Sequence, residues 1–351
     1  MCSGECLEDD CYSLCFKIFI TDQVGTYMAD KDKEYWRNEA VGFLALSTVR
    51  GVGYWTLHRL AASGIGFKDF LKNSECSELE KELRITIDKT EGDWAQHQKN
   101  LWDRGLELAR DLGSRYIRLI FQDQEEFPAS LKDIPDGPLW LFVQGNTRNL
   151  YEKSVAIVGT RKPSHDGLFL TKYVVAALSN LKFPTVSGLA SGIDQLAHEE
   201  SLRYHIPTIA VLGNGIFKDF PKGSEALRGL IVSCGGTVIT EYLPYQSYSA
   251  ENFVRRNRIQ AALCDTLIPV EWNIKSGTAH TVEYAYKYGR KIANVFLPHT
   301  TNHRPEIPFS EESRSAVSFE VPIATTELLR YIKEKELVST SSTPGQQTLD
   351  I

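Results

Sequence analysis

Short apolar runs alternate with helix-length segments through the middle of the chain. Val155–Val158 has the length of a strand buried on both faces of a parallel sheet, and an amphipathic segment beginning near Asp166 follows it. Comparable runs recur at 184–186, 208–212, 237–240, 266–271 and 291–296, and helix-length segments separate them. The pattern predicts an α/β fold with a doubly wound, mainly parallel sheet and right-handed crossovers.

Helical periodicity precedes this pattern. Apolar runs at 41–46 and 55–60 flank Gly51-Val52-Gly53, and a longer helix is expected over 94–112. We therefore predict a small all-helical domain at 34–113, of the helix-hairpin-helix or SAM-like kind. Two interpretations of its Gly-Val-Gly turn stay open. Either the turn amides grip a phosphate backbone, or Trp55 and its apolar neighbours form only the core of the domain.

The boundaries of the sheet domain are less clearly marked. Two β-like runs, 116–121 and 139–143, are predicted to add edge strands, which places the domain at 114–300. The apolar pattern fades after that point. For 301–351 we predict one short helix near 325–336 and a disordered tail rich in Ser, Thr, Pro and Gln.

Composition limits the size of the core and the expected location of the protein. The chain has 351 residues, 42% of them hydrophobic, enough for the cores of one or two domains. The sequence contains neither a run of 18 apolar residues nor a basic, apolar N-terminus, so we predict no membrane span, no signal peptide and a cytoplasmic protein. The scattered cysteines in the body of the chain suit a reducing compartment.

Four cysteines gather at the N-terminus, where Cys2, Cys6, Cys11 and Cys15 form C-x3-C-x4-C-x3-C. This spacing is looser than that of zinc knuckles. We interpret residues 1–33 as a mobile extension without a metal, and a metal site is the alternative. The formal net charge of −6 argues against a protein coated with nucleic acid, but Lys and Arg outnumber Asp and Glu between residues 151 and 300. A local basic groove is thus permitted.

The loops after the predicted strands carry the candidate chemistry. The carboxyl ends of adjacent parallel strands meet at one edge, so the loops at 159–161 and 187–192 are expected in one crevice. Helix N-termini and glycines suit such loops to anions, and the departure from G-x-G-x-x-G argues against a dinucleotide. The predicted anion-binding residues here are Gly159, Thr160, Arg161, Ser187, Gly188, Ser191 and Gly192.

Further candidates follow downstream. The segment 252–262 contains Arg255, Arg256, Asn257 and Arg258, donor-rich side chains suited to phosphates and to stacking on bases. The alternative is that these arginines pair with Glu241, Glu251 or Asp265. Additional groove residues are predicted at Lys222 and at a helix start formed by Ser276, Gly277 and Thr278. No catalytic constellation assembles around His198, so we predict neither an enzyme nor a cofactor.

Taken in order, these motifs resemble the DNA-processing protein A family, also called Smf. The matching segments are VAIVGTR at 155–161, SGLASGIDQLAH at 187–198, TIAVLGNG at 208–215, FPKGSEAL at 220–227, RRNRI at 255–259 and SGT at 276–278. The resemblance implies a Rossmann-like homodimer that protects single-stranded DNA and helps load the RecA recombinase in DNA uptake, natural transformation and recombination. It maps the DNA groove to Arg161, the 187–192 loop, Lys222, Arg256 and Arg258.

Two other hypotheses come from resemblance. The related lysine-decarboxylase-like group cleaves nucleotide N-glycosidic bonds with a Gly-Thr-x-x-Glu segment. Here Glu283 lies two residues too far from Gly277-Thr278, which disfavours that enzyme. The tail at 345–351 resembles peptides that dock on the replication sliding clamp, and a chance ending in apolar residues is the alternative.

Overall fold

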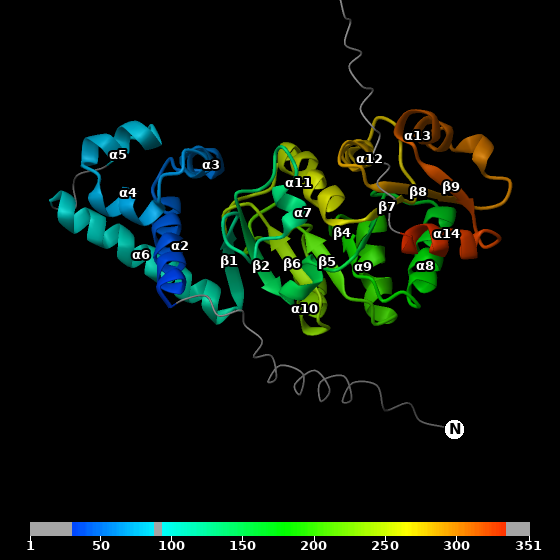
Figure 1. Ribbon diagram of the computed structural model, residues 1–351, viewed down its shortest axis with the longest axis horizontal. Helices are drawn as coiled ribbons and strands as arrows, with labels where there is room; N and C mark the ends of the chain where they lie inside the picture. The colour runs from blue at the N-terminus through cyan, green and yellow to red at the C-terminus, as the bar shows by residue number, and fades with distance from the viewer. Residues whose placement is uncertain (1–29, 88–92, 335–351) are drawn as a thin grey trace, which may run out of the picture.

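The computed structural model describes residues 30–87 and 93–334 (Figure 1). A helical unit lies beside one end of a nine-stranded sheet that helices cover on both faces. The cysteine-rich stretch and the 345–351 tail lie outside the described residues. The metal and sliding-clamp hypotheses that rest on them therefore stay predictions.

The helical unit is built on two long helices that pack closely. Gly105 of the second helix lies against the first, where an added Cβ would be 2.5 Å from the carbonyl oxygen of Val41. Leu57 and Leu60 are buried, as the core interpretation expects, whereas Trp55 is 52% exposed. The helices of this unit are α2 (Asp30–Ser47), α3 (Tyr54–Ala62), α4 (Phe67–Asn73), α5 (Cys76–Leu83) and α6 (Trp94–Ser114).

The sheet has the order β1-β2-β6-β5-β4-β3-β7-β8-β9. All neighbours from β6 to β9 pair in parallel, whereas β2 pairs antiparallel with both β1 and β6. The strands are β1 (Ile117–Phe121), β2 (Trp140–Gly145), β3 (Val155–Val158), β4 (Thr185–Ser187), β5 (Thr208–Val211), β6 (Thr237–Thr240), β7 (Thr266–Pro269), β8 (Lys291–Phe296) and β9 (Val317–Glu320). The predicted doubly wound α/β fold is confirmed.

Helices cover both faces of this sheet. One face carries α8 (His165–Leu178), α9 (Ile193–Arg203), α10 (Glu225–Ser233) and α14 (Thr325–Lys333); the other carries α7 (Ala129–Lys132), α11 (Ala250–Leu263), α12 (Gly277–Lys287) and α13 (Glu306–Arg314). Short 3₁₀ turns occur at η1 (Thr147–Leu150) and η2 (Thr301–His303). Serine side chains fix two helix starts, because Ser164 accepts from the Gly167 amide and Ser249 from the Asn252 amide.

Two sequence predictions need correction. Of the two predicted edge strands only β1 lies at an edge, because β2 is paired on both sides. The expectation of a single helix beyond residue 300 is also wrong, since α13 and β9 precede α14 and β9 extends the sheet. Within β9 only Phe319 is buried, so the strand lacks the apolar run that marks the others.

The helical unit and the sheet share one apolar core. Phe43 of α2 packs edge-on against Trp140 of β2, with ring centroids 4.8 Å apart. Tyr54 of α3 lies 5.3 Å from the same indole and 5.5 Å from Tyr242 after β6. These contacts hold the Gly-Val-Gly turn beside the carboxyl ends of the parallel strands.

Candidate functional site

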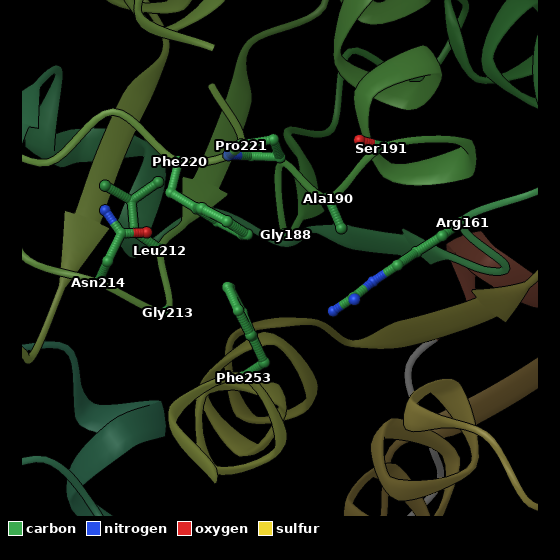
Figure 2. A pocket seen from close by; sticks show the side chains of 10 residues that line it. All are labelled: Arg161, Gly188, Ala190, Ser191, Leu212, Gly213, Asn214, Phe220, Pro221 and Phe253. Carbon is green, nitrogen blue, oxygen red and sulfur yellow. The ribbon is translucent and has the colours of Figure 1, made fainter. Parts of the chain in front are cut away.

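The predicted loops converge on one cleft at the carboxyl edge of the sheet. The cleft has a volume of about 690 Å³ and is lined by the 158–162 loop after β3, by α11 and by the start of α12. A smaller hollow continues it between the loops after β4 and β5 (Figure 2). We call the two together the Arg161 cleft, because the exposed side chain of Arg161 lines both.

Most of the predicted site residues line the Arg161 cleft, and the others lie behind or beside it. The lining includes Gly159, Thr160, Arg161, Gly188, Ser191, Arg256, Asn257, Ser276, Gly277 and Thr278. Ser187 is buried and donates to the Ile157 carbonyl. Gly192 has φ +92° and lets the chain approach the Thr160 carbonyl. Lys222 is exposed on the loop next to Pro221, which lines the hollow.

A buried acid and a buried base form the floor of the cleft. Asp194, in the first turn of α9, accepts from the backbone amides of Gly159, Gly188 and Ala190. Burial raises the pKa of Asp194 to about 6, although Arg256 and these amides act in the opposite direction. The carboxylate therefore links the loop after β3 to the loop after β4.

Arg256 joins the loop after β4 to the end of β5. Its guanidinium donates to the carbonyls of Gly188 and Val211, at the ends of β4 and β5. Burial lowers the pKa of Arg256 to about 10, so it stays charged at neutral pH. A Cβ on Gly188 would lie 2.3 Å from Nη1 of Arg256, so only glycine leaves room for this cation.

The neighbouring arginines face away from the cleft. Arg258 is fully buried and forms two hydrogen bonds with Glu241, of 2.6 and 2.8 Å. A phosphate contact by Arg258 does not fit this burial, and the alternative, pairing with Glu241, is what the structure shows. Arg255 also approaches Glu241, at 3.7 Å, and its guanidinium lies 4.3 Å from the centre of the Trp55 ring.

Aromatic rings beside Arg161 were missed by the sequence analysis. The centre of the Phe253 ring lies 5.4 Å from the Arg161 guanidinium, and the ring packs against Phe220, with centroids 5.2 Å apart (Figure 2). Phe220 stacks on Tyr248, with centroids 3.8 Å apart. An added Cβ on Gly213 would lie 2.5 Å from Phe253, so this glycine admits the ring. Phe253 stands two residues before Arg255 in the sequence, but nothing in the sequence places its ring beside Phe220 and Tyr248.

The groups required by the enzyme hypothesis do not meet at the cleft. His198 is buried, its Nδ1 lies 2.7 Å from the Thr208 hydroxyl, and burial lowers its pKa to about 3. Glu283 pairs with Lys287 and Arg314, at 3.3 and 2.6 Å, and is not among the lining residues. Neither side chain is placed to act as an acid or base on a ligand in the cleft.

The described residues also lack the features of a metal centre and of a membrane span. Within 30–87 and 93–334, no cluster of three or more His, Cys, Asp or Glu side chains is arranged to hold a metal ion. None of the helices in these ranges combines the length and the apolar character needed to cross a membrane.

The fold and the cleft define a Rossmann-like α/β protein with a cationic, aromatic-lined site at the carboxyl edge of its sheet. The chain belongs to the DNA recombination-mediator protein A family, whose model matches residues 118–307. It is 37% identical to the DNA processing protein DprA of Streptococcus pneumoniae over 166 residues, and 31% identical to the protein Smf of Synechocystis over 277 residues. These matches cover 47% and 76% of this chain.

The matched regions span only 58% and 65% of the length of those two relatives. Solved structures agree with the assignment. The X-ray structure of the Streptococcus pneumoniae protein aligns with a TM-score of 0.59 at 25% identity, covering 80% of this chain and 94% of that one. A structure of the Helicobacter pylori DNA processing protein A, which concerns its single-stranded DNA binding mode, aligns with a TM-score of 0.53 at 25% identity, over 61% and 96%.

Proposed function

We propose that the chain binds single-stranded DNA in the Arg161 cleft and acts in DNA recombination and processing. The observation that carries the proposal is the pairing of an exposed cation, Arg161, with the rings of Phe253, Phe220 and Tyr248. Proteins that bind single strands combine a positive groove for phosphates with aromatic platforms for bases. The single-stranded DNA binding mode of the Helicobacter pylori relative supports the same ligand.

Each part of the cleft has a task in this proposal. Arg161 neutralises a phosphate, and Lys222 adds a second exposed charge beside Pro221. The loop amides and the start of α12 at Gly277 favour further backbone oxygens. Arg256, which is only 3% exposed, adds positive potential at the floor of the cleft. The bases of a single strand are free to stack on these rings, whereas the bases of a duplex are already stacked and paired inside the helix. We therefore expect single strands to be preferred to duplex.

Removing Arg161 tests the proposal. Arg161→Ala should weaken binding of a labelled oligothymidylate at least tenfold in fluorescence anisotropy, about 1.4 kcal/mol, because it deletes the exposed charge beside the stacking rings. Lys172→Ala is the matched control, since Lys172 is exposed on α8 and does not line the cleft. Equal affinities for the two variants would contradict the proposal.

The family resemblance carries the finer parts of the proposal. We infer that the chain is a cytoplasmic homodimer that protects single-stranded DNA and helps load a RecA-type recombinase onto it. Recombinase filament assembly on strands coated with single-strand binding protein should accelerate in its presence, and sedimentation should give twice the mass of one chain. A monomer, or an unchanged assembly rate, would refute the corresponding part.

A further inference from the structure

A second hollow lies between the helical unit and the sheet. It has a volume of about 720 Å³ and is lined by the Gly-Val-Gly turn, the start of α3 and the 243–246 segment after β6. Two large aromatic residues in its lining are exposed, Trp55 by 52% and Tyr245 by 59%. We call this hollow the Trp55 groove. Because about half of each ring is exposed, packing in the apolar core does not account for the whole surface of Trp55 and Tyr245.

Arginine side chains lie over aromatic rings beside the two exposed rings of this groove. The Arg255 guanidinium lies 4.3 Å from the centre of the Trp55 ring. The Arg115 guanidinium lies 4.7 Å from the centre of the Phe217 ring, and the centre of that ring is 5.0 Å from the centre of the Tyr245 ring. Alternating rings and guanidinium planes form the surface on which single-stranded bases stack.

Two carboxylates that contact these arginines already have partners. Asp111 pairs with Arg115 at 2.9 Å, and Glu241 is buried against Arg258 at 2.6 Å. The groove therefore does not present a bare negative charge from either residue to a polyanion.

One loop connects this groove with the Arg161 cleft. Tyr248 lines the cleft and stacks on Phe220, whereas Tyr245 and Gln246 line the Trp55 groove. Three residues of fully extended chain span at most about 11 Å, so the Cα atoms of Tyr245 and Tyr248 lie within that distance. A strand that leaves the cleft over Tyr248 reaches Tyr245 within a few nucleotides.

We propose that the Trp55 groove is a second base-stacking subsite for the single strand held in the Arg161 cleft. The inference rests on the proposed function and extends its track onto the helical unit. Bases stack on Trp55 and Tyr245, and Arg255 and Arg115 lie beside the strand. The Gly-Val-Gly turn then serves the protein as part of a nucleic-acid surface as well as a helix connection.

Strand length separates the two subsites experimentally. A strand of about 6 nucleotides fills the Arg161 cleft, and one of about 20 nucleotides reaches the groove, given the site sizes of single-strand binding folds. Trp55→Ala should weaken binding of the long strand about fivefold or more and leave the short strand unchanged. Arg161→Ala should weaken both. Tyr35→Ala, which removes a similarly exposed ring from the same unit, should change neither.

The outcomes distinguish the inference from the proposed function. If Trp55→Ala matches Tyr35→Ala at both lengths while Arg161→Ala weakens both, the inference alone falls. If Arg161→Ala leaves the affinity unchanged at both lengths, both the proposed function and the inference that rests on it are refuted. If Trp55→Ala changes the sedimentation of the protein without DNA and not its affinity for the long strand, a second copy covers the groove and the inference is refuted.

Discussion

Glu241 should be the most sensitive single position for stability outside the apolar core. Its carboxylate is 1% exposed and accepts two hydrogen bonds from Arg258 and one of 2.5 Å from the Tyr54 hydroxyl. Its backbone carbonyl accepts from the Trp140 indole at 2.7 Å. The residue thus joins α3 of the helical unit, β2 and α11 at one point.

Glu241→Gln keeps the shape of the side chain and removes its charge. Arg258, which is fully buried, would then keep only the half-exposed Asp136, at 3.3 Å, as a counterion. Breaking a buried ion pair from one side costs about 3–5 kcal/mol, because the remaining charge is desolvated without compensation. The glutamine oxygen keeps part of the Tyr54 hydrogen bond, so we expect about 3 kcal/mol, a large part of the stability of a typical domain.

Urea denaturation followed by far-UV circular dichroism measures this change. Glu283→Gln is the matched control, because Glu283 pairs with Lys287 and Arg314 near the surface and should cost about 1 kcal/mol or less. Glu241→Gln combined with Arg258→Met should recover most of the loss, since neither charge is then left buried. A Glu241→Gln variant within about 1 kcal/mol of the wild type would refute the reasoning.

Two other predictions concern the floor of the cleft. Gly188→Ala should displace the Arg256 guanidinium, because the new Cβ would lie 2.3 Å from its Nη1 atom. We expect single-strand binding to weaken about tenfold and stability to fall by about 1–3 kcal/mol. An unchanged affinity and an unchanged urea midpoint would contradict the role assigned to Gly188. Asp194 should titrate near pH 6 in a carboxyl NMR experiment, and an inflection near pH 4 would contradict its burial. Because its native pKa is raised, the folded state holds this proton more tightly, so stability should increase by about 1 kcal/mol from pH 7 to pH 5 and not in Asp194→Asn.

Much of the site was predictable because strand and loop order determine which residues share an edge. Arg161 and Ser276 lie far apart in sequence, yet the alternation of strands and helices places both in one cleft. The sequence does not reveal which way a helical residue faces. Arg256 and Arg258 look alike in the motif, but the first lies beneath the cleft and the second is paired with Glu241.

Other features had no local signal. The fold brings Phe220, Tyr248 and Phe253 together from separate loops and α11, and no spacing in the chain marks that contact. Trp55 was interpreted as a possible core residue because it belongs to an apolar run, but it lies on the exposed side of α3. Strand β9 was missed because, at the edge of the sheet, only its Phe319 is buried.

The salt dependence of single-strand binding tests the central proposal most directly. Affinity should fall linearly on a log–log plot, with a slope of about −0.7 for each phosphate neutralised. Arg161→Ala should make that slope shallower by about 0.7, because it removes one such contact, and Lys172→Ala should leave it unchanged. A slope near zero for the wild-type protein, or tighter binding of duplex than of single strand at equal length, would contradict the account.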